Sequence, residues 1–211
     1  MIAHRGASFL APENTIASAK LAWELGADAV ESDIYLSKDN KIMVNHDANT
    51  NRTSGKNFII KETNSDTLRE LDVGSFKSEK YKGEKIPFLQ EIINTVPNGK
   101  ELVIEIKCGS EVLPYLKKVI NSYKRNKKFV FISFDFQTIS DTKKTFPKYS
   151  CYWLCSNHDL LKKNISRVSG AGLEGISLNY TIIDEKVASQ IKELNLELFS
   201  WTIDNPDEGK R

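Results

Sequence analysis

The segment AVESDIYLSKDNKIMVNHD, residues 29–47, decides the fold because it contains two candidate strands joined by a short turn. Residues 29–36 and 41–46 are rich in Val, Ile, Met and Tyr, which favour strands, whereas residues 37–40 are Ser-Lys-Asp-Asn, a composition typical of turns. So short a connection permits an antiparallel hairpin and excludes a parallel crossover. We therefore predict a β-hairpin at this place.

The register of the hairpin determines which side chains meet. Glu31 and Asp33 share one face of the first strand, because side chains alternate along a strand. A turn of two or four residues would bring His46 onto that face, whereas a three-residue turn would place it on the other face. We predict the first register, since two carboxylates and an imidazole that converge form a metal site or an acid–base site. The alternative is a solvated edge hairpin with scattered charges.

The composition is that of an ordinary water-soluble domain. The 211 residues suit a single domain, residues 1–211, and the net charge of +2 with 27% charged residues favours neither a nucleic-acid partner nor disorder. Three cysteines without a CxxC pair indicate neither a zinc ribbon nor a disulfide framework. The first residues lack a signal-peptide pattern and no apolar run is long enough for a transmembrane segment, so we predict a cytoplasmic protein. A mature form without its signal would look the same.

On the N-terminal side of the hairpin, the pattern indicates one strand–helix unit. Residues 1–3 form a short apolar strand, and a helix is predicted from about residue 15 to residue 25. Asn14 is the predicted N-cap of this helix, and Gly26 marks its end.

On the C-terminal side of the hairpin, residues 49–100 are polar and rich in turn-forming residues. Helices are predicted only at residues 65–71 and 88–96. A stretch of this length between strands is typical of an insertion over the active-site end of a sheet, or of a mobile segment.

From residue 101 onward, strands and helices alternate regularly. The predicted strands are residues 102–106, 129–133, 149–154, 175–178 and 197–203, and the predicted helices are residues 111–123, 136–145, 159–169 and 185–194. With the two strands before residue 37, this alternation supplies seven strands that can lie parallel. The predicted fold class is α/β, a TIM-type (βα)₈ barrel, and an open doubly wound sheet is the alternative.

In a TIM-type barrel the reacting groups lie at the C-terminal ends of the strands. The polar residues found there are His4, Arg5, Glu31, Asp33, His46, Glu105 and Lys107. Glu31, Asp33 and Glu105 are the ligands that a hard divalent cation such as Mg²⁺ or Ca²⁺ prefers, although they could also be ion-pair partners of basic residues without a metal. His4 and His46 are suited to proton transfer near neutral pH.

Short motifs follow one another along nearly the whole chain. They are HRG at residues 4–6, PENT at 12–15, ESD at 31–33, HD at 46–47 with Arg52 and Thr53 following, PFLQE at 87–91, EIK at 105–107, ISF at 132–134 and WT at 201–202. In this order and spacing they resemble the glycerophosphodiester phosphodiesterase family.

The resemblance implies a metal-dependent phosphoric diester hydrolase of glycerol and lipid metabolism, with a small insertion after the catalytic hairpin. It implies His4 and His46 as general acid and base. It further implies Glu31, Asp33 and Glu105 as ligands of one divalent metal ion (Mg²⁺ or Ca²⁺), Arg5 and Lys107 as phosphate-contacting residues, and Trp201 near the substrate alcohol. The expected small-molecule substrate is a glycerophosphodiester, which is cleaved to glycerol 3-phosphate and an alcohol.

Two alternatives remain at this point. The chain could act on lipid phosphodiesters as a lysophospholipase D or a phospholipase-C-like enzyme, or it could be a catalytically silent barrel. One departure from the family pattern concerns the last βα unit, which does not follow the WT motif. We therefore expect that unit to be missing and the sheet to be open, with lower stability or association into a homo-oligomer through that edge.

Overall fold

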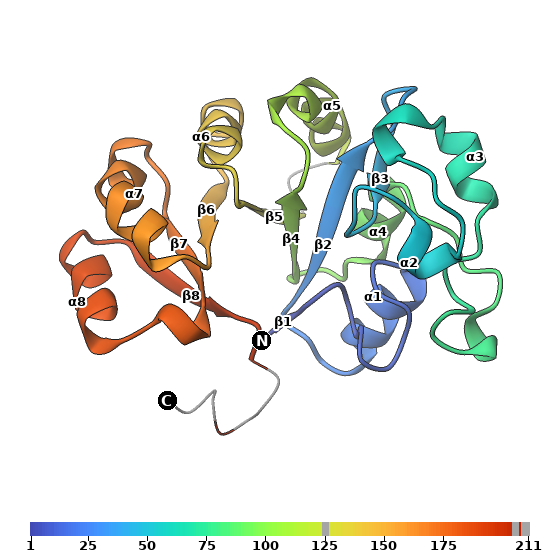
Figure 1. Cartoon of the computed structure of the whole chain (residues 1–211), viewed down its shortest axis with the longest axis horizontal. Coiled ribbons are helices and arrows are strands. Elements are labelled where there is room, and N and C mark those ends of the chain that lie inside the picture. Colours follow the sequence, from blue (N-terminus) through green and yellow to red (C-terminus); the bar gives the residue numbers. More distant parts are fainter. Residues whose placement is uncertain (124–126, 204–206, 208–211) are drawn as a thin grey trace. The chain divides into compact units, whose positions relative to one another are not determined.

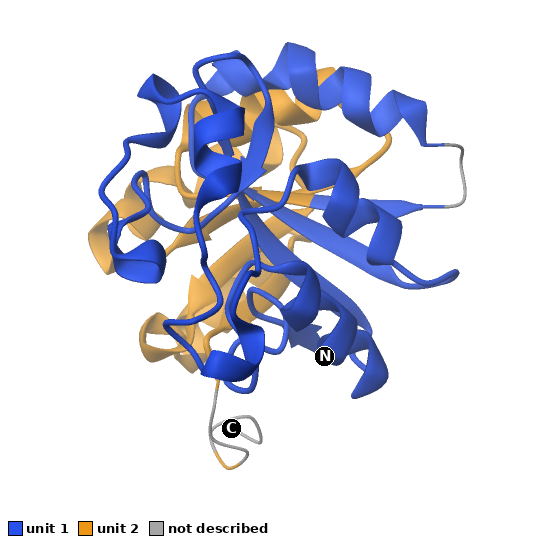
Figure 2. Cartoon of the chain, turned by 90° about the vertical axis from the view of Figure 1, so that its right-hand side faces the viewer, with its two compact units in different colours: residues 1–130 blue, residues 131–211 orange. Residues whose placement is uncertain are grey.

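A computed structural model of the chain describes residues 1–123, 127–203 and 207. The chain divides into two compact units, residues 1–130 and residues 131–211, which Figure 2 shows in blue and orange. In the described part of the chain, no helix combines the length and the apolar character that crossing a membrane requires.

The first unit is built on a parallel sheet of three neighbouring strands, β1 (Ile2–Ala3), β2 (Ala29–Leu36) and β4 (Glu101–Ile106). Strand β3 (Ile42–Val44) lies antiparallel on β2. The first six residues of β2 are all buried, as expected for a central strand that is covered on both faces. Spatial order follows chain order, as in a barrel, and lacks the reversal of a doubly wound sheet.

The hairpin forms as predicted, but its predicted register is wrong. Ile34 pairs with Val44 and Leu36 pairs with Ile42, so that even-numbered residues face even-numbered ones. Five residues, 37–41, separate the two strands. The Ser37 hydroxyl closes this loop, because it accepts from the Lys41 backbone N–H and donates to the Lys41 carbonyl. If β3 continued in this register, His46 would point to the face opposite Glu31 and Asp33. The strand instead ends at Val44, which frees His46 from this alternation.

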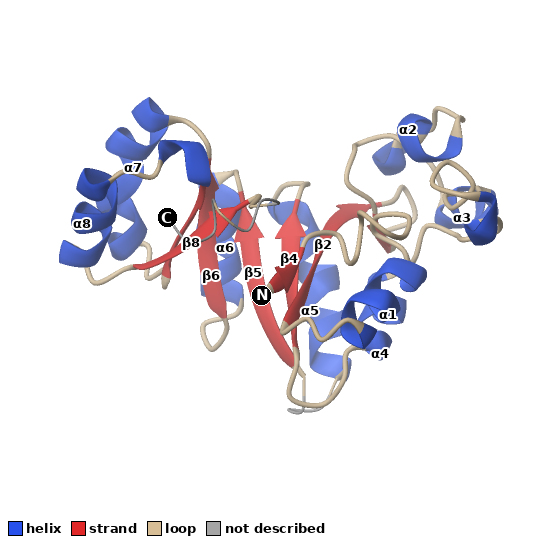
Figure 3. Ribbon diagram, turned by 90° about the horizontal axis from the view of Figure 1, so that it is seen from below, coloured by secondary structure: helices blue, strands red, loops and turns tan. Residues whose placement is uncertain are grey.

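Helix α1 (Ile16–Glu24) begins at Thr15, not at Asn14 as predicted. The Thr15 hydroxyl accepts from the Ser18 backbone N–H and the Ser18 hydroxyl accepts from the Thr15 N–H, which is a capping box. Helices α1 and α4 (Leu89–Thr95) lie side by side in Figure 3, and the indole N–H of α1 residue Trp23 donates to the Thr95 hydroxyl at 3.1 Å.

The segment after the hairpin has its own small core. It contains α2 (Asn51–Ser54), α3 (Ser65–Glu70) and the short 3₁₀ helices η1 (Ile60–Glu62) and η2 (Glu79–Tyr81). Its buried apolar side chains join one residue of β3 in a single cluster, Met43, Ile60, Leu68, Leu71, Val73 and Ile86. The helices predicted at residues 65–71 and 88–96 are α3 and α4. The segment is therefore folded against the hairpin, and its status as an insertion stays a prediction.

After β4, the chain forms η3 (Ser110–Val112) and α5 (Leu113–Ser122), and it passes from the first unit to the second within β5 (Lys128–Ser133). In the second unit, β6 (Ser150–Cys155), β7 (Gly175–Asn179) and β8 (Glu197–Trp201) are parallel neighbours in chain order. Helix α6 (Phe136–Thr145) leads from β5 to β6, α7 (His158–Gly170) connects β6 to β7, and η4 (Tyr180–Ile182) with α8 (Glu185–Glu193) connects β7 to β8 (Figure 1).

The βα alternation predicted after residue 101 is confirmed, with element ends that differ by one or two residues. The spacing between β7 and β8 depends on Gly175, where a Cβ atom would meet the Glu197 backbone oxygen at 2.0 Å. The last residues of the chain, except residue 207, lie outside the described residues, so a missing final unit stays a prediction.

Candidate active site

Three buried carboxylates form the centre of the candidate site. Glu31 and Asp33 lie two residues apart on β2 and therefore share a face, and Asp33 is the register partner of Glu105 on β4. Their exposed fractions are 5%, 0% and 7%. One ligand oxygen from each lies within 4.8 Å of the other two. The predicted metal-binding set is thus brought together by adjacent parallel strands.

Arg5 reaches this centre from the loop between β1 and α1. Its backbone N–H donates to Glu31 Oε2 at 2.9 Å, and its guanidinium Nε lies 3.5 Å from Asp33 Oδ2. Its φ of 55° and that of 77° at Gly6 bend the loop sharply after His4. Gly6 is required there, since a Cβ atom would lie 2.6 Å from the Ser18 backbone.

Asn14 is a site residue that the sequence analysis assigned to the wrong role. Its side-chain amide donates from Nδ2 to Asp33 Oδ2 at 2.8 Å, and its Oδ1 accepts from the Asp33 backbone N–H at 3.2 Å. The residue is 4% exposed and has a φ of 56°. Asn is among the residues that tolerate this conformation, and here the side chain fixes one oxygen of Asp33 while leaving the other available.

Lys107 and His46 meet at the other side of the carboxylates. The Lys107 ammonium lies 2.9 Å from Glu105 Oε1 and 3.7 Å from Asp33 Oδ1. It also lies 3.3 Å from His46 Nε2. His46 therefore reaches the site despite the different register, because it follows the end of β3. Its second ring nitrogen, Nδ1, bonds to the Asp47 carboxylate at 2.7 Å, which orients the ring and holds a proton on Nδ1.

Glu13 and Arg52 extend the site in a way that the motifs did not reveal. Arg52 donates from Nε to Asp47 at 2.7 Å and from both terminal nitrogens to the two oxygens of Glu13 at 2.7 and 2.8 Å. Glu13 also accepts from the Arg5 guanidinium at 3.1 Å. Arg52 follows the HD motif and Glu13 belongs to PENT, but neither motif predicts their contact, because segments 39 residues apart in sequence leave no local pattern.

The charges of the site fit a divalent cation. Five carboxylates, Glu13, Glu31, Asp33, Asp47 and Glu105, face the basic side chains of Arg5, Arg52 and Lys107, so that two negative charges are left over when all are ionised. Among the described atoms, Glu31 Oε1 and Asp33 Oδ1 are buried without a hydrogen-bond donor. Burial and the nearby Asp33 charge raise the pKa of Glu31, and they raise that of Glu105 to about 7. Buried carboxylate oxygens of this kind are the donors that Mg²⁺ and Ca²⁺ take.

His4 lies directly before Arg5 and is half-buried. Burial lowers the pKa of His4, and the positive charges of Arg5 and His46 lower it further, whereas Asp33 opposes them. The neutral imidazole is therefore favoured at neutral pH, which suits a group that accepts a proton.

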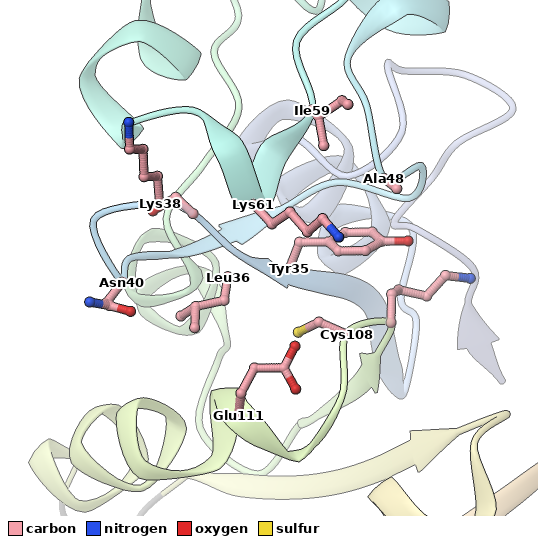
Figure 4. Close-up of a pocket in the computed structure, with 11 residues that line it drawn as sticks. Tyr35, Leu36, Lys38, Asn40, Ala48, Ile59, Lys61, Cys108 and Glu111 are labelled. Atoms are coloured by element: carbon pink, nitrogen blue, oxygen red, sulfur yellow. The ribbon is translucent and has the colours of Figure 1, made fainter.

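Lys107 is also one of the lining residues of a pocket of about 480 Å³. Figure 4 shows this pocket with Tyr35, Lys61, Cys108 and Glu111 labelled. Tyr35, Lys61, Cys108 and Glu111 are among its lining residues, and they come from β2, η1 and the segment after β4. Burial raises the pKa of Tyr35 to about 12, so its hydroxyl stays a hydrogen-bond donor at neutral pH. The pocket thus offers hydroxyl, ammonium and carboxylate groups next to a residue of the candidate site.

Trp201, the remaining predicted site residue, belongs to the second unit. Its indole N–H donates to the Ser177 carbonyl at 3.1 Å, and its ring packs edge-to-face on Phe134 with 5.4 Å between the centroids. These contacts orient the indole within its own unit. Its contact with a substrate stays a prediction.

Comparison with known proteins identifies relatives over the whole chain. The profile of the glycerophosphoryl diester phosphodiesterase family matches residues 4–211. A glycerophosphodiester phosphodiesterase of Caldanaerobacter subterraneus subsp. tengcongensis is 34% identical over 225 residues, which cover 100% of this chain and 88% of that protein.

Solved structures show the same fold. A phosphodiesterase of Oleispira antarctica in complex with its product sn-glycerol-3-phosphate has a TM-score of 0.92 and 28% identity, covering 99% of this chain and 86% of that one. A glycerophosphodiester phosphodiesterase of Thermotoga maritima has a TM-score of 0.81 and 25% identity, covering 99% and 88%. The parallel strands alternating with helices match these TIM-barrel neighbours. The chain therefore belongs to the glycerophosphoryl diester phosphodiesterase family and is a phosphoric diester hydrolase.

Proposed function

We propose that the chain hydrolyses glycerophosphodiesters to glycerol 3-phosphate and an alcohol such as choline, ethanolamine or glycerol, with a divalent metal ion and two histidines. The observation that carries the proposal is the convergence of three carboxylate oxygens within 4.8 Å beside a lysine that contacts His46. The product bound to the Oleispira relative supports the same substrate class.

Charge neutralisation is the main requirement for attack on a phosphodiester anion. In this proposal Arg5 and Lys107 bind the non-bridging oxygens of the phosphate, and both already lie at the edge of the carboxylate centre. Glu31, Asp33 and Glu105 would hold a divalent ion, which would supply Lewis-acid stabilisation of the phosphate charge. Asn14 keeps Asp33 oriented for that purpose.

The proton transfers fall to the two histidines. His4, whose pKa is lowered by burial and by Arg5, takes the proton of a glycerol hydroxyl. The hydroxyl oxygen then attacks phosphorus, and His46 gives a proton to the oxygen of the departing alcohol. The product of this step is a cyclic phosphate. Water then opens the ring with the histidine roles reversed, which yields glycerol 3-phosphate and restores both histidines.

The test is incubation with glycerophosphocholine and quantification of glycerol 3-phosphate, with and without EDTA, for the unchanged chain and for His46→Ala. We expect turnover that EDTA abolishes and that His46→Ala reduces by a factor of about 10²–10⁴. Turnover that persists in EDTA would remove the metal from the mechanism. Choline phosphate as the product would place the cleavage on the other side of phosphorus, and no turnover with any divalent ion would favour a silent barrel.

A second candidate is action on lysophospholipids, because apolar side chains are exposed on the loop that carries His4. Phe9 is 89% exposed and Leu10 is 52% exposed, and the Lys77 ammonium lies 5.8 Å from the Phe9 ring centroid. Exposed aromatic and aliphatic groups beside a lysine are suited to contact with a lipid surface. Lysophosphatidylcholine offered beside glycerophosphocholine separates the two candidates, since a lysophospholipase D would release choline from the former at the higher kcat/KM.

A further inference from the structure

Arg52 joins the two loops that carry the candidate proton carriers. One loop, residues 4–15, contains His4 and Glu13, and the other, residues 45–50, contains His46 and leads into α2. The Arg52 guanidinium uses all three of its nitrogens in these contacts, one toward Asp47 and two toward Glu13, at 2.7 to 2.8 Å. Fork-like contacts of this kind hold two partners in one plane.

The contacts continue on both sides as far as the reacting groups. On one side, Asp47 bonds to His46 Nδ1 at 2.7 Å. On the other side, Glu13 bonds to the Arg5 guanidinium at 3.1 Å. A continuous chain of charged hydrogen bonds therefore connects the histidine ring to the arginine that would bind phosphate, and Arg52 is its central link.

The solvent exposure of the residues in this series of hydrogen bonds favours a positioning role over a stabilising one. The Arg52 side chain is 44% exposed and that of Asp47 is 28% exposed, whereas that of Glu13 is 15% exposed. Ion pairs with this much solvent contact contribute little to the free energy of folding. They can still restrict the direction of a ring, and small misplacements of reacting groups reduce rates by large factors.

We propose that Arg52 is a positioning residue. It acts through Asp47 on the ring of His46, and through Glu13 on the guanidinium of Arg5. It thereby fixes the positions of the ring and the guanidinium relative to each other. Without Arg52, Glu13 keeps only Arg5 as its cationic partner and draws it away from the phosphate. Asp47 then loses the group that fixes the carboxylate behind His46. The inference rests on the proposed function, in which both groups act on the phosphodiester.

The experiment compares the metal-loaded enzyme with Arg52→Ala, Arg52→Lys, Glu13→Gln and the double variant Arg52→Ala/Glu13→Gln, using glycerophosphocholine. Arg69→Ala is the control, because Arg69 makes an equivalent two-bond contact with Glu91 at 2.8 and 3.0 Å outside the candidate site, with a side chain that is 27% exposed against 44% for Arg52. Melting temperature is measured for every protein.

For Arg52→Ala we expect kcat to fall about tenfold to a hundredfold, while KM changes less than about threefold and the melting temperature stays near that of the unchanged enzyme. Arg52→Lys restores only part of the loss, because a single ammonium cannot bridge both carboxylates. Guanidinium ion added to Arg52→Ala raises kcat. The double variant loses no more kcat than the more affected single variant, since both substitutions interrupt the same series of hydrogen bonds. Arg69→Ala lowers the melting temperature without an equivalent loss of kcat, because Arg69 also donates to the Ile86 carbonyl at 2.8 Å and lies over the Phe88 ring.

A loss of kcat that parallels the melting temperature, full rescue by Arg52→Lys, or single losses that multiply in the double variant would overturn the proposal. A readout independent of turnover is the Nδ1 proton of His46 in NMR spectra, which are simple because the chain has three histidines. We expect this proton to be protected from exchange in the unchanged protein and in Arg69→Ala, and exposed in Arg52→Ala. Equal protection in all three proteins would overturn the proposal even if the substrate assignment were wrong.

Discussion

Replacing Glu105 by glutamine is expected to stabilise the metal-free protein at pH 8 but not at pH 5. Burial and the Asp33 charge raise the pKa of Glu105 from 4.5 to about 7. The folded protein therefore holds this proton at pH values at which the unfolded chain has already lost it. A group of this kind contributes stability that is fully present below its unfolded pKa and is lost as the pH rises through the folded pKa.

The size of the effect follows from the two pKa values. A rise of this pKa from 4.5 to about 7 corresponds to about 3 kcal/mol that the ionised carboxylate costs the folded state at pH 8. Glutamine keeps the shape of the side chain without the charge, so the variant avoids this cost. For a chain of this size, about 3 kcal/mol corresponds to a rise in melting temperature of about 6–12 °C. At pH 5 both side chains are neutral in the folded state, and most of the difference disappears.

The assay is thermal and urea-induced unfolding of both proteins in EDTA at pH 5 and pH 8. Taking the difference between the two proteins at each pH removes the contributions of groups such as His4 that Glu105 does not perturb, whereas the pKa of Glu31, which the Glu105 charge raises, changes with the substitution. A second series with Mg²⁺ should reverse the order at pH 8, because the cation offsets the repulsion in the unchanged protein, and the variant offers one ligand fewer.

Two results would refute the reasoning. A variant that is less stable than the unchanged protein at pH 8 in EDTA would show that the ion pair between Lys107 and Glu105, at 2.9 Å, outweighs the burial of the carboxylate. An equal difference at pH 5 and pH 8 would show that the effect does not come from ionisation.

Three further substitutions test the local geometry. Asn14→Ala removes the amide that orients Asp33 and should weaken Mg²⁺ binding by about tenfold to a hundredfold in calorimetric titrations, and unchanged affinity would contradict this role. Gly6→Ala should lower the free energy of unfolding by about 1–3 kcal/mol in urea titrations, since the new Cβ would meet Ser18 at a positive φ, and an unaltered midpoint would argue against the strain. His46→Ala should lower kcat by about 10²–10⁴ while glycerophosphocholine binding persists, and a change confined to KM would speak for a binding role instead.

The predicted metal-binding set came together because it depends on short-range rules. Glu31 and Asp33 are two residues apart on one strand, and the next parallel strand places Glu105 beside them. Strand alternation and the sideways order of parallel strands are sufficient for such a placement. The same rules located the helices and strands after residue 101 within a residue or two.

The hairpin register could not be obtained in the same way. Ser-Lys-Asp-Asn indicates a turn but not its length, and including Lys41 in the loop changes which faces the two strands present. Whether His46 would remain within the strand was equally open. Asn14 was misassigned for a related reason, because asparagine is favoured both at an N-cap and at positions with positive φ. Only the neighbouring Thr15, which caps the helix, decided between the two roles.

The chain of contacts through Arg52 illustrates a different limit. It joins residues 13, 47 and 52, and nothing in the local sequence around any of them requires the other two. Its existence depends on how the loop after β1 approaches the loop after β3, which only the folded structure specifies. Sequence motifs do not predict contacts of this kind, even where every motif is correctly assigned.

Every residue of the candidate site except Trp201 lies between positions 4 and 107, within the first unit. For the evolution of this protein, the proposed ligands and proton carriers are thus encoded in a different stretch of the gene from the second unit. Changes in the codons for residues 131–201 alter neither the proposed metal ligands nor the two proposed proton carriers, so that this stretch can drift under selection for folding and for the surroundings of Trp201. Recombination between relatives at β5 would exchange one stretch while it keeps the chemistry of the other.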